Sequence, residues 1–248
     1  MKRSLCWLFI LAFLGTCGKG ATEDPILRLS AAEAMAEGKA LVERGKYGLA
    51  REYFQHAFEV EPNSAMGREA LLLVADALFG QGGSQNYLKA EAKYRDFQNR
   101  FPTSDRSAYV QFQIARSLEE RVRPPDRDQS IGRKALEAFD DVILVFPTSE
   151  YALQSRERIT GIRQILAESE FIKGRFNHKL RLYQAAVNRY DYLLEEFPEF
   201  LETDKVLFHL IRSLQVLEQV DRAAEVQKKM REEHPESEYL SQLSQLAK

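Results

Sequence analysis

One spaced pair of residues recurs along the chain and limits its fold more than any other feature. An alanine stands twelve residues before a proline five times, at Ala50/Pro62, Ala90/Pro102, Ala135/Pro147, Ala186/Pro198 and Ala223/Pro235. The position eight residues before these prolines holds Phe54, Tyr94, Phe139, Tyr190 and Gln227. An alanine and an aromatic four residues apart share one helix face, and proline ends the helix before it. Five copies predict a stack of helical hairpins.

The first copy resembles the tetratricopeptide repeat, a pair of antiparallel helices that stacks into solenoids. Its signature positions hold Gly38, Leu41, Ala50, Phe54, Ala57 and Pro62, and the fourth copy keeps Gly174, Ala186, Tyr190 and Pro198. The sequence therefore predicts an all-α, right-handed α-solenoid of about five such hairpins over residues 30–248. We expect N-terminal repeats at 30–123 and C-terminal repeats at 124–248.

The prolines and the apolar spacing also predict where individual helices begin and end. We expect helices at 30–44, 47–61, 64–80, 86–101, 104–122, 128–146, 149–176, 180–197, 201–218, 221–234 and 237–247. Serine follows four of the prolines by two residues, as Ser64, Ser104, Ser149 and Ser237. A serine at this position is expected to accept hydrogen bonds from the free backbone N–H groups of the next helix.

The first residues have the features of an export signal. Two basic residues precede an apolar run, Leu5–Leu14, which is too short to cross a bilayer but suits a signal-peptide core. Cys17 follows, with a leucine three residues before it and small residues between, as in the bacterial lipobox. We expect a lipoprotein-type signal peptide at 1–16, a lipid on Cys17 and a tether at 17–29. The alternative is an ordinary secretory signal with an incidental cysteine.

Residues that carry chemistry are sparse in the body of the chain. The only cysteines are Cys6 and Cys17, and the four histidines do not stand at metal-ligand spacing. No phosphate-binding loop or catalytic serine or zinc motif occurs. The formal net charge is −2, without the basic stripe that nucleic-acid binding needs. We therefore expect no catalysis, cofactor, metal or nucleic acid, and interpret the chain as a protein-binding scaffold.

Two segments are candidates for protein contacts. The charged, proline-stiffened segment 123–129 interrupts the third hairpin, and it is either a contact site or a turn that caps the next helix through Asp126 or Asp128. Tyr109 and Phe112 lie on the first helix of that hairpin, the kind of helix that lines the concave face of such a solenoid. They are expected to line a peptide groove or, alternatively, to pack between repeats.

Several motifs together resemble the BamD family, the lipoprotein subunits of the machine that folds β-barrels into the outer membrane of Gram-negative bacteria. The matching motifs are Pro125-Asp126-Arg127-Asp128-Gln129, Ala135 with Phe139, Phe146–Tyr151, Leu166–Glu170, Tyr183 with Ala185-Ala186, Asn188-Arg189 and Phe197-Pro198. Generic tetratricopeptide proteins lack the Asp-Arg-Asp insertion and the Leu-Ala-x-x-Glu helix. The resemblance covers nearly the whole chain.

The resemblance implies a lipid-anchored protein on the periplasmic face of the outer membrane. It implies that the C-terminal repeats dock onto the barrel-forming (BamA-like) subunit, beside accessory lipoproteins, and that the N-terminal repeats receive unfolded outer membrane proteins. Asp126, Arg127, Asp128, Glu170 and Arg189 are the implied partner-binding residues, although Arg189 is equally a candidate for a structural ion pair. The alternative is another periplasmic tetratricopeptide lipoprotein, serving division, pilus assembly or secretion.

Overall fold

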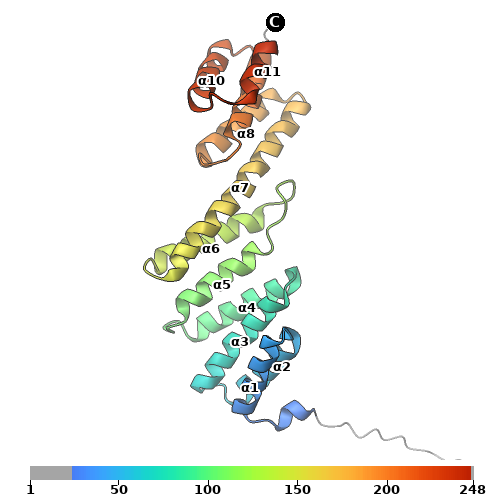
Figure 1. Ribbon diagram of the computed structural model, residues 1–248, viewed down its shortest axis with the longest axis vertical. Coiled ribbons are helices and arrows are strands. Elements are labelled where there is room, and N and C mark those ends of the chain that lie inside the picture. Colours follow the sequence, from blue (N-terminus) through green and yellow to red (C-terminus); the bar gives the residue numbers. More distant parts are fainter. Residues whose placement is uncertain (1–23, 247–248) are drawn as a thin grey trace, which may run out of the picture.

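The computed structural model describes residues 24–246, which form a long stack of helices (Figure 1). The predicted signal peptide and Cys17 lie outside this range. A short 3-10 helix, η1 (Pro25–Arg28), precedes the α-helices α1 (Ala31–Glu43), α2 (Tyr47–Val60), α3 (Ala65–Gln81), α4 (Ser84–Arg100), α5 (Ser107–Glu119), α6 (Ser130–Val145), α7 (Glu150–Lys179), α8 (Tyr183–Glu196), α9 (Thr203–Val216), α10 (Val220–Glu233) and α11 (Glu238–Leu246). Over this range there is no strand, and the predicted all-α solenoid of tetratricopeptide-type hairpins is confirmed.

Serine caps begin three of the four helices for which the sequence predicts one; in the last of them, Ser237 Oγ accepts from the backbone N–H of Tyr239 in α11 at 3.3 Å. Ser64 Oγ accepts from the backbone N–H of Gly67 at 2.9 Å, and Ser149 Oγ accepts from Ala152 at 3.2 Å. Ser104 is different, because its Oγ accepts from Arg106 within a turn and α5 begins only at Ser107. The expectation that Ser104 starts a helix is therefore wrong by three residues.

The repeated glycine and aromatic positions explain how each hairpin closes. Gly38 on α1 faces the ring of Phe54 on α2, and Gly174 on α7 faces the ring of Tyr190 on α8. A Cβ atom at either glycine would overlap the facing ring, so only glycine lets the two helices approach this closely. Phe54 and Tyr190 are fully buried, and each such ring contributes about 2 kcal/mol of hydrophobic stabilisation.

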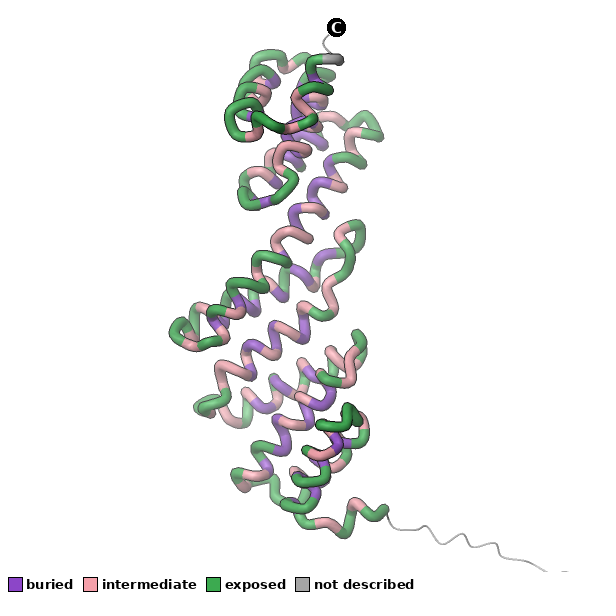
Figure 2. The backbone as a smooth tube through the Cα atoms, viewed as in Figure 1, coloured by how far each residue is buried: buried purple, intermediate pink, exposed green. Residues whose placement is uncertain are grey.

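Buried side chains form a nearly continuous core along the axis of the stack (Figure 2). One apolar cluster extends from Ala31 to Ile114 and a second from Phe112 to Ala223. Both clusters take residues from α5, which therefore joins the two parts of the core. Leu243 of α11 is buried beside Phe208 and Met230, so α11 covers the apolar end of the last hairpin.

The longest helix, α7, belongs to both parts of the stack (Figure 1). Near its start Tyr151 contacts the ring of Phe112 on α5 at 5.3 Å between centroids. Farther along, Phe171 lies 6.1 Å from the ring of Tyr190 on α8 and 5.4 Å from that of His209 on α9. Its 30 residues are too polar for a membrane span, and no other helix within 24–246 is long and apolar enough to be one.

The last residues of the predicted tether pack on the first repeat. Asp24 caps η1 by accepting from the backbone N–H of Ile26 at 3.0 Å. The carbonyl oxygen of Leu29 lies 2.9 Å from His56 Nε2 on α2, and the Leu29 side chain packs against the N-terminal core. The chain therefore joins the folded body before α1 begins.

Candidate protein-binding site

The insertion between α5 and α6 is held from inside by one buried side chain. Gln129, 2% exposed, donates from Nε2 to the carbonyl oxygens of Arg123, Pro124 and Arg127, at 3.2, 2.8 and 3.2 Å. These three bonds fix a loop that has no regular secondary structure of its own. The sequence marks Gln129 only as part of a motif, since its role depends on carbonyl groups that the folded loop brings together.

Asp126, Arg127 and Asp128 of the insertion divide into two roles. Asp128 accepts from the backbone N–H and the hydroxyl of Ser130, the first residue of α6, and these bonds lower the pKa of its carboxyl. Asp128 therefore serves the turn that leads into α6, one of the two roles that the sequence left open, although the cap position of the helix is Gln129. Asp126 and Arg127 form an ion pair of 3.5 Å on the surface, with side chains 57% and 68% exposed. Both side chains face solvent.

Glu170 and Arg189, far apart in sequence, meet between α7 and α8. Arg189 Nη1 donates to Glu170 Oε2 at 3.0 Å, and Lys173 Nζ donates to Glu170 Oε1 at 2.7 Å. The Glu170 side chain is buried, whereas the Arg189 side chain is 48% exposed. Arg189 therefore forms an ion pair while about half of its side chain remains accessible to solvent. Among the described residues, no hydrogen bond or ion pair joins Glu170 or Arg189 to the insertion.

Tyr109 and Phe112, the predicted groove residues, occupy different environments. Phe112 is 4% exposed and packs on Phe139 and Tyr151. Its side chain fills the space between repeats. The expectation that Phe112 lines a groove is therefore wrong, and the alternative, packing between repeats, describes its position. Tyr109 is partly buried, and its hydroxyl donates to Asp76 Oδ1 at 2.7 Å.

Asp76 links three helices and was not identified from the sequence. Its Oδ1 accepts from Tyr94 of α4 and from Tyr109 of α5, both at 2.7 Å. Burial raises the pKa of the Asp76 carboxyl, although the two tyrosine hydroxyls and Arg106 oppose the shift. Asp76 also lines a cavity of about 450 Å³ between α3 and the start of α5, beside Arg68 and Arg106. An aspartate on a helix gives no sequence signal of such a role, because its partners lie 18 and 33 residues away.

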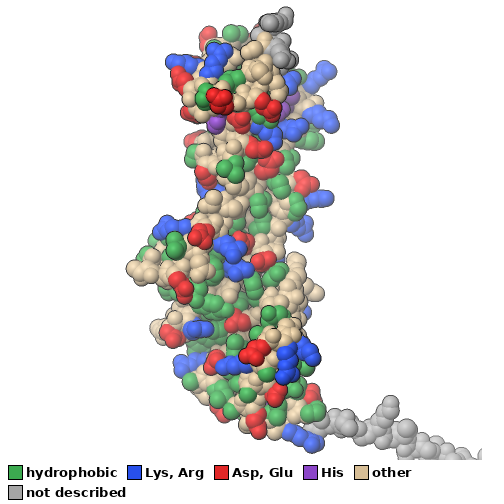
Figure 3. Space-filling model, in the orientation of Figure 1, with side chains coloured by type: hydrophobic (Ala, Val, Ile, Leu, Met, Phe, Trp, Pro, Cys, Tyr) green, Lys and Arg blue, Asp and Glu red, His purple; other side chains and the backbone are tan. Residues whose placement is uncertain are grey.

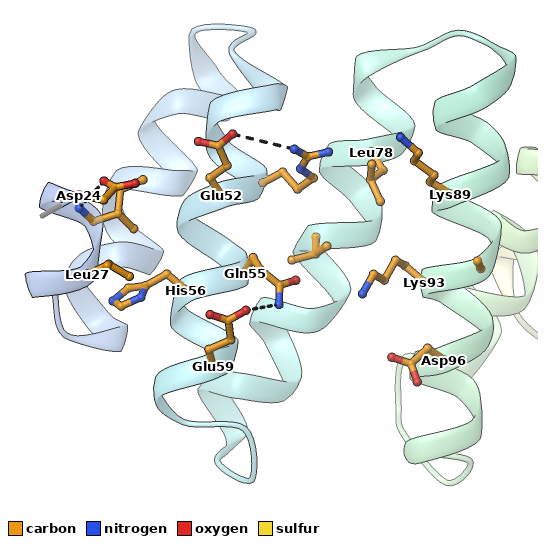
Figure 4. Close-up of a pocket in the computed structure, with 14 residues that line it drawn as sticks. Asp24, Leu27, Glu52, Gln55, His56, Glu59, Leu78, Lys89, Lys93 and Asp96 are labelled. Atoms are coloured by element: carbon orange, nitrogen blue, oxygen red, sulfur yellow. Dashed lines mark hydrogen bonds and ion pairs between the residues drawn. The ribbon is translucent and has the colours of Figure 1, made fainter. Parts of the chain in front are cut away.

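A larger cavity, of about 720 Å³, lies between η1, α2, α3 and α4. Figure 4 shows Glu52 and Glu59 on the α2 side and Lys89 and Lys93 on the α4 side, with Leu78 of α3 between them. Because the walls carry both signs, the cavity gives little preference for a ligand of one charge. Among residues 24–246 no group of three His, Cys, Asp or Glu side chains is placed to hold a metal ion.

Comparison with known proteins places this architecture in a family. The chain is 28% identical over 212 residues to the outer membrane protein assembly factor BamD of Rickettsia prowazekii, covering 86% of this chain and 83% of the relative. It is 27% identical over 176 residues to the protein of the same name from Caulobacter vibrioides, covering 71% and 57%. Among solved structures, the TPR2AB-domain:pHSP90-complex of yeast Sti1 is similar with a TM-score of 0.48 and 16% identity, covering 85% of this chain and 80% of that one.

The family model described as outer membrane lipoprotein, YfiO, matches residues 28–230. That range contains the insertion, the Glu170–Arg189 pair and the repeats around them. The resemblance to the BamD family that the motifs indicated is confirmed by these matches. The chain belongs to the YfiO family of outer membrane lipoproteins.

Proposed function

We propose that this chain is a non-catalytic, lipid-anchored scaffold that assembles β-barrel proteins into the outer membrane from its periplasmic face. The observation that carries the proposal is the family match across residues 28–230 together with relatives named as outer membrane protein assembly factors. A solenoid of stacked hairpins suits this role, because it offers long surfaces for other proteins.

The C-terminal repeats would dock onto the barrel-forming, BamA-like subunit and its accessory lipoproteins. Arg189 supports this assignment, because half of its side chain is exposed while the buried Glu170 orients it. A guanidinium held in this way can still donate to a partner's carboxylate. Asp126 and Arg127 add an exposed charged pair on a loop that Gln129 holds in place.

The N-terminal repeats would receive unfolded outer membrane proteins. The cavity between α3 and α5 has room for a side chain of an extended segment, and its wall offers charged groups of both signs, among them Arg68, Arg106 and Asp105. Tyr109 supports the wall through its bond to Asp76. Lipidation of Cys17 would tether the body, and the residues between Cys17 and η1 would set its distance from the membrane.

Binding to the periplasmic domains of the same organism's barrel-forming subunit tests the proposal. The full chain, purified in detergent, is titrated by calorimetry at two salt concentrations. We expect saturable one-to-one binding that Arg189→Glu weakens and that Arg44→Glu, on the exposed end of α1, leaves unchanged. Absence of binding by a folded, helical protein at both salt concentrations would overturn the assignment and favour another periplasmic adaptor.

The anchor has its own test in the mass of the mature protein. Chain extracted from membranes should begin at Cys17 and carry the added mass of its acyl chains. Cys17→Ser should release the protein from the membrane fraction. A mature protein that begins elsewhere, or that keeps Cys17 unmodified, would contradict lipid anchoring while leaving the docking proposal intact.

A further inference from the structure

A groove between α7 and α9 concentrates positive charge that neither the repeat packing nor the proposed docking face uses. It encloses about 460 Å³ and is lined by Arg175, Phe176, His178 and Lys179 from α7 and by His209 and Arg212 from α9, among others. Figure 3 shows Lys and Arg side chains gathered with a histidine on the upper right of the view, where Figure 1 places the C-terminal end of α7. No acidic side chain lines the groove.

The cations of this groove are available to a ligand. Within residues 24–246, Arg175, Lys179 and Arg212 form no ion pair with a carboxylate, whereas other cations there do, such as Arg189 with Glu170. The guanidinium of Arg175 lies 5.8 Å from the centre of the Phe171 ring, and that of Arg212 lies 5.6 Å from the Phe208 ring. A guanidinium stacked on a ring keeps the N–H donors of its edge free for a carboxylate.

One acidic residue, Glu168, interacts with a cation of the groove but does not neutralise the groove. Glu168 lies farther toward the start of α7, where burial raises the pKa of its carboxyl and Lys205 and Arg175 oppose that shift. Lys205 is itself bonded to Glu202 at 2.7 Å. At this end the carboxylates of Glu168 and Glu202 face the cations of Lys205 and Arg175, which leaves the positive charge of Lys179 and Arg212 unbalanced.

The two histidines of the groove are held neutral by their surroundings. Burial, followed by the charges of Arg175 and Arg212, lowers the pKa of His209 to about 4. Burial and Arg212 also lower the pKa of His178, whose Nδ1 lies 2.8 Å from Ser213 Oγ. At neutral pH the positive charge of the groove therefore comes from its arginines and its lysine.

The two arginines repeat at the spacing of the hairpins. Arg175 and Arg212 are 37 residues apart. Arg181 and Glu218 are also 37 residues apart, and both have a positive φ angle, 61° and 57°, in the turns of successive hairpins, so 37 residues is the length of this repeat. Neighbouring packed helices lie about 8–10 Å apart. An extended chain advances about 3.3 Å per residue, so carboxylates two or three residues apart can reach both arginines.

Apolar side chains lie beside this charged groove. Phe176, Leu180 and Val216 are 59%, 53% and 52% exposed, and they stand at the ends of α7 and α9. Leu182, just before α8, and Val220, the first residue of α10, are 53% and 70% exposed. The starts of α8 and α10 lie close together, since Gln219 Nε2 donates to Gln184 Oε1 at 3.4 Å. Positive charge beside exposed apolar surface suits a partner that carries acidic and apolar residues.

We propose that the groove between α7 and α9 binds an extended acidic segment of a partner protein, with carboxylates on Arg175 and Arg212 and apolar side chains against Phe176 and its neighbours. A concave groove between two helices admits a polypeptide strand, whereas a flat membrane surface reaches it poorly. The site is separate from the Arg189 face. Successive residues turn by about 100° around a helix, so Glu170 and Lys173 lie on the side of α7 opposite Arg175 and Lys179.

Fluorescence anisotropy with a labelled peptide tests this inference. The probe is a ten-residue peptide of alternating glutamate and leucine with blocked ends, and the control peptide has glutamine in place of glutamate. The full chain in detergent should bind the acidic probe saturably, more weakly at high salt, and should bind the control peptide much less. Each of Arg175→Gln and Arg212→Gln should raise the Kd about tenfold.

The matched control is Arg44→Gln, which removes a positive charge from the exposed end of α1 and should leave the Kd for the probe unchanged. The inference and the docking proposal are tested with different partners, the acidic peptide and the barrel-forming subunit, so each can fail while the other holds. Equal affinity for the acidic and glutamine peptides, or unchanged affinity of helical Arg175→Gln/Arg212→Gln protein, would overturn the inference. Arginine-dependent binding to phosphatidylglycerol vesicles without peptide binding would overturn it in favour of a lipid headgroup.

Discussion

Arg189 and Glu170, 19 residues apart in the chain, are joined by a hydrogen bond of 3.0 Å that ties α8 to α7. The carboxylate is buried and also accepts from Lys173, whereas about half of the Arg189 side chain faces solvent. A residue that a partner would contact is thus also part of the fold. Its effect on binding must be separated from its effect on stability.

A double-mutant cycle of Glu170→Gln and Arg189→Gln measures that structural contribution. We expect a coupling free energy of about 1 kcal/mol, because solvent screens the half-exposed guanidinium. Urea unfolding followed by circular dichroism gives the four free energies of unfolding. A coupling indistinguishable from zero would mean that Arg189 does not stabilise the fold, and that any binding defect of its variants is direct.

The close approach of α7 and α8 makes Gly174 a sensitive position. A Cβ there would overlap the Tyr190 ring, so Gly174→Ala should lower the free energy of unfolding by about 2–3 kcal/mol. Gly161, on the same helix, has nothing within 4 Å of a Cβ, and Gly161→Ala should raise stability by about 0.5–1 kcal/mol. Denaturant unfolding compares the two. Equal effects would contradict the packing argument.

Gln129 gives the insertion its fixed shape. Gln129→Ala removes three hydrogen bonds to backbone carbonyls, so amide hydrogen exchange in residues 121–129 should become faster. The free energy of unfolding should fall by about 1–3 kcal/mol. Arg127→Ala removes only an exposed ion pair and should leave exchange unchanged. Unaltered exchange in the Gln129 variant would show that another interaction holds the loop.

His209 should make stability depend on pH in the acidic range. Burial and nearby cations, among them Arg175, Arg212 and Lys205, lower its pKa from 6.5 to about 4. Between these values the unfolded chain binds more protons than the folded one, so this contribution is lost as pH falls. Allowing for partial exposure to solvent, the stability advantage over His209→Gln should shrink by about 1–2 kcal/mol from pH 7 to pH 4. A constant difference would contradict the shift.

The stack itself could be predicted from the sequence because its cause is local. Pro62, Pro102 and Pro147 end helices whatever surrounds them, and the alanine and aromatic residues before them define one buried face. The expected helices accordingly agree with the structure within a few residues. Ser104 shows where this reasoning ends, because its hydroxyl serves a turn rather than the first N–H groups of α5.

The functional surfaces were less predictable because they depend on residues brought together by packing. Asp76 accepts hydrogen bonds from tyrosine hydroxyls on two other helices. Gln129 donates to backbone carbonyls that only the folded loop brings together, so the sequence does not indicate its role. Phe112 has the position of a groove residue but turns into the core. Arg175 and Arg212 line one groove because they occupy the same position in successive repeats. This relationship can be seen in the sequence only after the hairpins have been aligned.

The length of α7 sets a condition on how this molecule can change over evolution. Its 30 residues form a rod of about 45 Å, and both parts of the stack take their orientation from it. One residue inserted midway would turn everything beyond it by about 100° and advance it by about 1.5 Å. The loop at Asp126 can lengthen without moving either part, whereas a single insertion or deletion within α7 would re-aim every contact surface toward the C-terminus.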